Sequence, residues 1–79
     1  MNQSQKIIAD IMSDHFKVDR QLIHSDATFA DIRFDSLVLV ELALVLENEL
    51  DIRVADGELR DHMTIAEAAE VVAAKKAVL

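Results

Sequence analysis

The residue best placed to take part in chemistry is Ser36, in the run Asp35-Ser36-Leu37 between an acidic loop and a strongly apolar segment. A serine hydroxyl becomes a catalytic nucleophile when a base lies within hydrogen-bond reach, and no base stands at a recognisable spacing from Ser36. The hydroxyl is better suited to accept a group from another enzyme. If Ser36 begins a helix, the partial positive charge of the helix N-terminus favours a phosphate there. On the tripeptide alone, an ordinary helix cap is the simpler explanation.

The composition fits one small helical domain spanning residues 1–79. The chain has no cysteine, which excludes a disulfide framework and a thiolate metal site. A hydrophobic fraction of 52% is too high for a disordered chain. Proline is absent, glycine occurs once and aromatic residues make up 4%, so we expect helices around an aliphatic core.

The formal net charge of −7 makes nucleic acid an unsuitable partner and favours partners with basic surfaces. No apolar run approaches the roughly 18 residues of a membrane span. The first residues lack the basic end and apolar core of a signal peptide. We therefore expect a monomeric, cytoplasmic protein without membrane insertion.

Apolar residues at helical spacing predict a first helix over residues 3–16, capped by Asn2 or Ser4. Its apolar face contains Ile8, Ile11, Met12 and His15. Residues 17–34 have no sustained period and predict a long loop. The side chains expected to hold this loop to the core are Leu22, Ile23, Phe29, Ile32 and Phe34.

A second helix should begin at Asp35 or Ser36 and end near Leu50, with apolar residues on two sides. The core stripe contains Leu39, Leu42, Ala43, Leu46 and Leu50. The opposite side carries Leu37, Val40 and Leu44 among acidic residues. Such a helix either lies buried between layers or binds a partner. Because so small a domain can hardly bury it all round, we favour a partner-binding face.

Residues 51–63 predict a loop with a short third helix near residues 56–61, where Gly57 weakens the helix. Thr64 and Glu67 form a capping box that predicts the start of a fourth helix. Its core face contains Ile65, Ala68, Ala69 and Val72. The expected fold is all-α, a four-helix bundle with three main helices, one short helix and a long loop between helices one and two.

Residues 29–37, FADIRFDSL, resemble the phosphopantetheine attachment site of acyl carrier proteins. In that family the segment typically reads Phe, any residue, Asp, Leu, Gly, any residue, Asp-Ser-Leu. Residues 40–42 and 46–51 resemble the recognition helix of the family, and residues 54–56 and 64–69 resemble its third and fourth helices. The resemblance covers nearly the whole chain in order, as in a free-standing carrier domain.

The resemblance implies that Ser36 carries 4′-phosphopantetheine through a phosphodiester, while Asp35 and Leu37 assist the modifying enzyme. The protein would then be a carrier and not an enzyme, with acyl groups held as thioesters on the cofactor. The implied pathways are fatty acid, polyketide or related lipid and secondary-metabolite biosynthesis. The implied partners are a phosphopantetheinyl transferase, an acyl-loading ligase or transferase, and synthases or condensing enzymes with basic surfaces.

Two further sets of residues follow from the same resemblance. The face read by partner enzymes would contain Leu37, Val40, Glu41, Leu44, Glu47 and Asn48. An acyl chain would enter between helices two and four, in a pocket lined by Leu39, Leu46, Val54, Leu59, Ile65, Ala68 and Val72.

The chain departs from the family pattern at a few positions. Arg33 replaces the usual glycine, so we expect the turn before Ser36 to form without a residue free to adopt positive φ. Phe34 is bulkier than usual, and Val38 and Asn48 replace residues that are often acidic. The less acidic, more apolar recognition helix is a hint of a specialised pathway.

Two alternatives remain open from the sequence. One is an unmodified helical interaction module that uses the same acidic and aliphatic face. The other is an aminoacyl or D-alanyl carrier, although Leu37 stands where a D-alanyl carrier often has phenylalanine. We expect no metal site, because His15, His24 and His62 show no metal-binding spacing.

Overall fold

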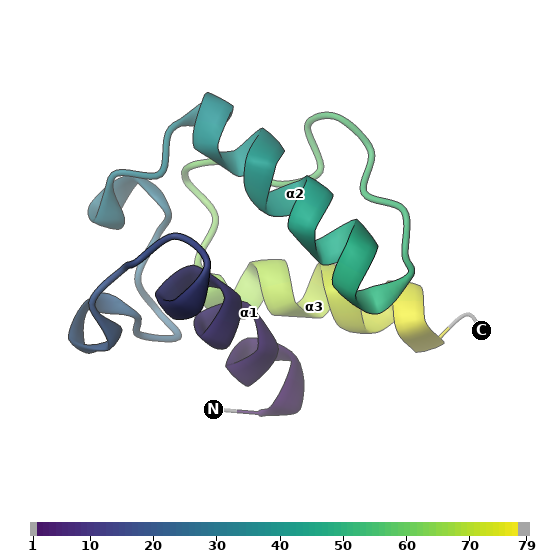
Figure 1. The fold of residues 1–79 in the computed structure, drawn as a ribbon, viewed down its shortest axis with the longest axis horizontal. Helices are drawn as coiled ribbons and strands as arrows, with labels where there is room; N and C mark the ends of the chain where they lie inside the picture. The colour runs from purple at the N-terminus through teal and green to yellow at the C-terminus, as the bar shows by residue number, and fades with distance from the viewer. Residues whose placement is uncertain (1, 78–79) are drawn as a thin grey trace.

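The computed structural model describes residues 2–77, which form three α-helices: α1 (Gln3–Asp14), α2 (Ser36–Leu50) and α3 (Ile65–Ala77) (Figure 1). Two short 3₁₀ turns, η1 (Arg20–Leu22) and η2 (Ala30–Ile32), lie in the connection between α1 and α2. Within residues 2–77 there is no β-strand, so the all-helical prediction is confirmed. None of the helices in this part of the chain is long and apolar enough to cross a bilayer.

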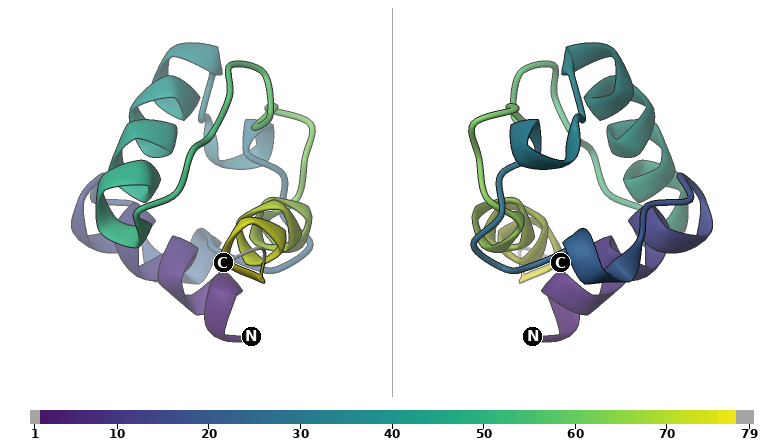
Figure 2. Two further views of the ribbon diagram at one scale, coloured as in Figure 1. Left: turned by 90° about the vertical axis from the view of Figure 1, so that its right-hand side faces the viewer. Right: turned by 90° about the vertical axis from the view of Figure 1, so that its left-hand side faces the viewer.

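The α1 helix packs mainly against α3, and α2 leans over this pair. The connection from α2 to α3 runs back beside α2 toward its N-terminal end before it descends to α3 (Figures 1 and 2). All three helices and both long connections contribute to one core. Its buried side chains are Ile8, Ala9, Met12, Ile23, Phe29, Phe34, Leu39, Leu42, Leu46, Val54, Leu59, Ile65, Ala68, Ala69 and Val72.

The α1 helix begins as predicted but ends earlier. The Asn2 side chain accepts a hydrogen bond from the Gln5 amide at 2.8 Å, which confirms Asn2 as the cap. The helix ends at Asp14 because Lys17 takes a left-handed φ of 61° and the Val18 amide donates to the Met12 carbonyl at 3.1 Å. His15, the C-cap residue, is exposed, and its assignment to the apolar face was wrong.

The long loop is held to the core largely by the predicted side chains. Ile23, Phe29 and Phe34 are at most 5% exposed, and Ile32 packs partly buried against them. Leu22 is 54% exposed, so its assignment to the core was wrong. It lies in the η1 turn, where its neighbour Ile23 takes the inward position.

The short helix expected at residues 56–61 is absent, and turns occupy this segment instead. Gly57 has a φ of 84°, which breaks the right-handed helical path. A single local bond from the Glu58 amide to the Ala55 carbonyl, 3.1 Å long, closes one turn without continuing into a helix. A fourth helix is thus not confirmed.

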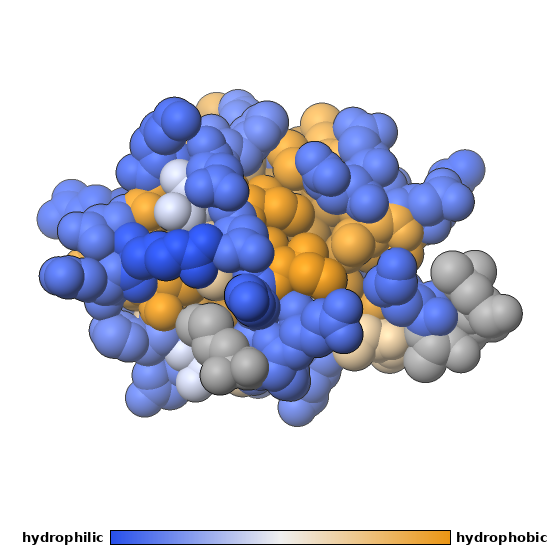
Figure 3. All heavy atoms as spheres, turned by 60° about the horizontal axis from the view of Figure 1, so that its bottom comes forward, coloured by the Kyte–Doolittle hydropathy of each residue, from blue (hydrophilic) through white to orange (hydrophobic). Residues whose placement is uncertain are grey.

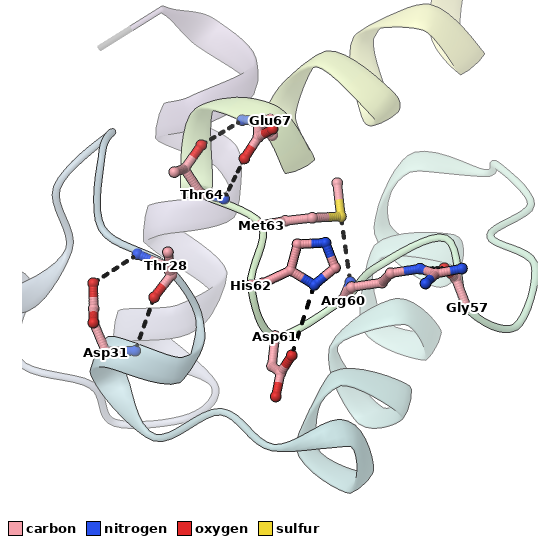
Figure 4. Close-up of polar contacts among 9 residues, drawn as sticks. All are labelled: Thr28, Asp31, Gly57, Arg60, Asp61, His62, Met63, Thr64 and Glu67. Atoms are coloured by element: carbon pink, nitrogen blue, oxygen red, sulfur yellow. Dashed lines mark hydrogen bonds and ion pairs between the residues drawn. The ribbon is translucent and has the colours of Figure 1, made fainter.

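A connection between the two long loops was not predicted. Thr28 and Thr64 form an antiparallel bridge, flanked by bonds from the Phe29 amide to the Met63 carbonyl at 3.1 Å and from the Ile65 amide to the Ala27 carbonyl at 3.0 Å. Thr64 and Glu67 form the predicted capping box at α3, with bonds of 2.9 and 3.1 Å. Thr28 and Asp31 form an equivalent reciprocal pair at η2, with both bonds at 3.1 Å (Figure 4).

The surface is not uniformly polar. On the face seen in Figure 3, an apolar area lies open between hydrophilic side chains. Several aliphatic side chains pack only partly buried against the core, including Ile11, Leu50 and Ile52. A core of this size leaves part of its apolar surface in contact with solvent.

Candidate functional site

The α2 helix begins with Ser36 as its first residue and Asp35 as its N-cap. The Asp35 carboxylate accepts a hydrogen bond from the Val38 amide at 3.0 Å, which fulfils the capping role. Ser36 is exposed, and among the described residues its hydroxyl makes no hydrogen bond. Capping therefore accounts for Asp35 and leaves Ser36 without a structural role at the helix start.

The turn before Ser36 contains a left-handed arginine. Arg33 has φ 64° and ψ 31°, and its amide donates to the Ala30 carbonyl at 3.1 Å. The expectation that this turn forms without positive φ was wrong, because Arg33 adopts the conformation that glycine takes without strain. Phe34 follows and lies in the core, with its ring 5.4 Å from Phe16 and 6.1 Å from Phe29. This aromatic anchor fixes the turn in place.

Two hollows meet at Ser36. The first, here called the helix groove, has a volume of about 170 Å³ and lies between α2 and the following connection. Its lining residues are Ser36, Leu39, Val40, Ala43, Leu44, Glu47, Val54, Ala55, Asp56, Gly57 and Leu59. Its walls are mainly aliphatic, so it offers an apolar surface that starts at the serine.

The second hollow, here called the loop groove, has a volume of about 330 Å³. It shares Ser36, Leu39, Gly57 and Leu59 with the helix groove and adds Arg60, Asp61 and His62. Figure 4 shows these last three side chains on the connection that leads to α3. The loop groove is therefore the more polar of the two.

The predicted acyl-pocket residues fall into two groups. Leu39, Val54 and Leu59 line the helix groove. The other four are at most 1% exposed within the closed core: Leu46, Ile65, Ala68 and Val72. All seven are buried, but the resemblance that suggested them could not show which of them line an open groove.

The second apolar side of α2 is open to solvent. Leu37, Val40 and Leu44 are 71%, 52% and 54% exposed. Glu41 and Asn48 are also exposed, and Glu47 lies partly buried at the edge of the helix groove. The prediction that this side is not part of the core is confirmed.

Part of the site was missed from the sequence. Ala55, Asp56 and Gly57 form the wall of the helix groove opposite α2, and Arg60 and His62 extend the loop groove. These residues have no periodicity, and their approach to Ser36 depends on the long-range path of the connection. Only Gly57, as the single glycine, marked a special backbone position.

An ion pair holds the wall of the helix groove to α3. The Lys75 ammonium donates to the Glu58 carboxylate at 2.8 Å, and the Ala55 amide donates to the same carboxylate oxygen at 2.6 Å. The hydrogen bond from Lys75, followed by that from Ala55, lowers the pKa of Glu58 below its ordinary value. Among the ion pairs of the described residues, this is the one that connects the groove wall to the end of α3.

Within the described residues, no three His, Asp or Glu side chains lie close enough to hold a metal ion. A further hollow between α1 and α2 carries Asp10, Asp14 and Glu49, but Ser36 does not line it.

Comparison with known proteins places this geometry in context. A family model described as "Phosphopantetheine attachment site" matches residues 6–72. The chain is 35% identical over 66 residues to an acyl carrier protein of Lactobacillus johnsonii, covering 82% of both chains. It is 39% identical over 54 residues to a chloroplastic acyl carrier protein of Brassica napus and to acyl carrier protein SF2 of Brassica campestris. These matches cover 68% of this chain and 40% of each plant protein, so the chain spans less than half their length.

Proposed function

The chain belongs to the acyl carrier protein family, whose members are carriers and not enzymes and whose cofactor is phosphopantetheine, and we propose that Ser36 is the residue that bears this cofactor. The main support for this proposal is the position of Ser36. It is the exposed first residue of α2, and Asp35 provides the N-cap in its place. Two grooves meet at Ser36.

The residues around Ser36 fit the group. Asp35 takes the Val38 amide, and the earlier amides of α2, which lack intrahelical partners, would favour a phosphate on the neighbouring hydroxyl. The grooves provide surface along which an attached arm can lie. When attached, the group supplies a terminal thiol that carries acyl groups as thioesters.

The helix groove suits the apolar part of the cargo. Its walls include Leu39, Val40 and Leu44 of α2 and Val54 and Leu59 of the connection. Burial of methylene groups against these walls would contribute about 0.8 kcal/mol for each fully buried group. Separation of α2 from α3 would expose the remaining predicted lining: Leu46, Ile65, Ala68 and Val72.

The exposed side of α2 is proposed as the surface that partner enzymes read. It combines the aliphatic Leu37, Val40 and Leu44 with Glu41 and Glu47, and Asn48 lies beside them. No lysine or arginine occurs between Asp35 and Asp51, so a partner with basic residues around an apolar centre fits this surface. Asp35 and Leu37 would contact the phosphopantetheinyl transferase.

The partners proposed are this transferase, an acyl-loading ligase or transferase, and synthases or condensing enzymes. The pathway proposed is fatty acid, polyketide or related lipid or secondary-metabolite biosynthesis. The apolar Val38 and the uncharged Asn48 support partners specialised for a less acidic recognition helix.

The test is the intact mass of the protein after incubation with coenzyme A and a broad-specificity phosphopantetheinyl transferase. We expect wild type to gain one phosphopantetheine and Ser36→Ala to gain none. Because Asp35 provides the cap, Ser36→Ala should change the free energy of unfolding by no more than about 0.5 kcal/mol.

The matched control is Ser25→Ala, which removes another exposed serine and should load normally. Loading of the Ser36→Ala protein would exclude Ser36 as the attachment residue. Absence of loading in wild type would favour the unmodified helical interaction module. Mass analysis of the native cargo separates acyl carriers from aminoacyl or D-alanyl carriers.

A further inference from the structure

The charges around Ser36 are unevenly distributed. The α2 helix contributes only carboxylates, and no lysine or arginine of this helix approaches the serine. Among the described residues that line the helix groove and the loop groove, Arg60 is the one arginine, and no lysine joins it. A phosphate on Ser36 would therefore face a single permanent positive charge from these grooves.

Arg60 is held in the loop groove by its backbone and by one side-chain bond. Its Nε donates to the Gly57 carbonyl at 3.1 Å, and its amide donates to the Met63 sulfur at 3.3 Å. Figure 4 shows the side chain running along the loop toward Gly57 and away from the Asp61 carboxylate. One guanidinium N–H is thus used to orient the side chain.

The outer end of the guanidinium has no partner within the described structure. None of the ion pairs or hydrogen bonds formed by the described residues involves the terminal nitrogens of Arg60. Asp61 lies closer to His62, whose Nδ1 is 3.9 Å from the Asp61 carboxylate. Arg60 therefore retains its terminal donors for an anion in the groove.

We propose that Arg60 binds the phosphodiester of the arm on Ser36 and orients the base of the arm across the loop groove. The inference rests on the proposed attachment at Ser36. Two guanidinium donors could bond two phosphate oxygens, and the N-terminus of α2 would add favourable partial positive charge. Arg60 acts here as a positioning residue, since the acyl group reacts at the far end of the arm.

Arg33 is the cation nearest to Ser36 along the sequence, and its surroundings differ from those of Arg60. It lines a separate hollow with Ala30, Phe34, Asp35 and Asp61, to which Ser36 does not contribute. Two carboxylates, Asp35 and Asp61, line that hollow with Arg33, whereas Asp61 is the one carboxylate that lines the loop groove with Arg60. Arg33→Gln is therefore a control that removes an equal charge from a hollow that Ser36 does not line.

The experiment uses the fully modified proteins, each verified by intact mass, in ³¹P NMR. Modified wild type should show a phosphodiester resonance that is broader than that of modified Arg60→Gln and lies at a different chemical shift, because the bound phosphate tumbles with the protein. Arg60→Gln should give a narrower, shifted resonance, whereas Arg33→Gln should match wild type. Raising the salt to about 1 M, where the screening length is about 3 Å, should move the wild-type signal toward that of Arg60→Gln.

Two additional readouts separate this role from a structural one. Arg60→Lys should keep the salt dependence, because the positive charge remains. The Nε–H resonance of Arg60 should shift when Ser36 is modified, and that of Arg33 should not. Circular dichroism verifies that Arg60→Gln remains folded.

The outcomes distinguish this inference from the proposed function. A modified Ser36 with identical ³¹P signals in wild type and Arg60→Gln would overturn the role of Arg60 alone. A change caused by Arg33→Gln in place of Arg60→Gln would also overturn it. No mass gain at Ser36 would overturn the proposed function, and the inference would be lost with it.

Discussion

At the scale of single residues, the turn before Ser36 depends on Arg33 in a left-handed conformation, with φ 64°. A residue with a Cβ atom is strained there by about 1–2 kcal/mol. The strain is maintained because Phe34 is buried immediately after it and η2 ends immediately before it. The turn that positions the candidate attachment site thus holds Arg33 in a backbone conformation that arginine does not favour.

Arg33→Gly should stabilise the protein by about 0.5 kcal/mol. Relief of the left-handed strain is partly offset by the extra freedom that glycine gives the unfolded chain, about 0.5–1 kcal/mol. Urea unfolding of wild type, Arg33→Gly and Arg33→Ala measures the effect. Arg33→Ala keeps a Cβ atom and should bring no gain; equal stability of the glycine and alanine variants would show that the turn is unstrained in solution.

The residue types at the site were predictable, but their roles were not. Asp and Ser are both good caps, so the sequence could not decide which of Asp35 and Ser36 caps α2. The backbone decides it, because Asp35 is extended while Ser36 is already helical. The same limit applies to Arg33, whose side chain gives no sign that its backbone takes the glycine conformation.

At the scale of elements, the wall of the helix groove is an irregular segment attached to α3 through Glu58 and Lys75. The side chains are 33% and 24% exposed, so the ion pair is partly shielded from solvent. The lowered pKa of Glu58 means that its charged form stabilises the folded state. The attachment of the wall should therefore depend on pH.

Glu58→Gln should lower the stability near neutral pH by about 0.5 kcal/mol or less, as for other partly exposed pairs. Because the folded-state pKa of Glu58 lies below the unfolded value, this stability is fully present above the ordinary glutamate pKa of about 4.3. It is lost as the pH falls through the folded-state pKa. Urea midpoints of both proteins from neutral to acidic pH measure the difference.

The control for this change is Glu70→Gln, which alters an exposed glutamate on α3. Its difference from wild type should show no comparable fall at acidic pH. A gap between wild type and Glu58→Gln that persists at low pH would contradict a role for the charge and indicate lost packing.

Regular elements were predictable because their signals are local. The capping box of Thr64 and Glu67 and the spacing of Ile65, Ala68 and Val72 define α3 within a few residues. The turns at residues 56–61 were not predictable, because a glycine such as Gly57 is compatible both with a weak helix and with a turn at positive φ. The pairing of Thr28 with Thr64 depends on tertiary contacts that no local pattern encodes.

At the scale of the whole molecule, acidic charge and exposed aliphatic side chains coincide on one side of α2. In the proposed function, the net charge of −7 would guide basic partners toward the protein, and Leu37, Val40 and Leu44 would supply the apolar contact. This side adds nothing to the closed core. Partner binding and stability should therefore respond to different residues of the same helix.

Leu44→Ala and Leu46→Ala test this separation. Leu44 is 54% exposed, so its truncation should change stability by no more than about 0.5 kcal/mol yet slow loading by the transferase. Leu46 is fully buried, and its truncation should reduce stability by about 2–5 kcal/mol. Thermal unfolding and loading rates measure both; similar loss of stability in the two variants would place Leu44 in the core.

The bridge between Thr28 and Thr64 also defines the topology of the chain. Together with the flanking backbone bonds, it ties a closed loop at a narrow neck, and α1 and α3 lie outside this loop. The cap of α2, both grooves and the exposed side of α2 lie inside it. Pairing of Thr28 with Thr64 closes the segment between them, and the conformational entropy of that closure is lost when this pair forms. The segment proposed to carry the cofactor is thus closed at one neck, yet it rests on α1 and α3 through the core that they share.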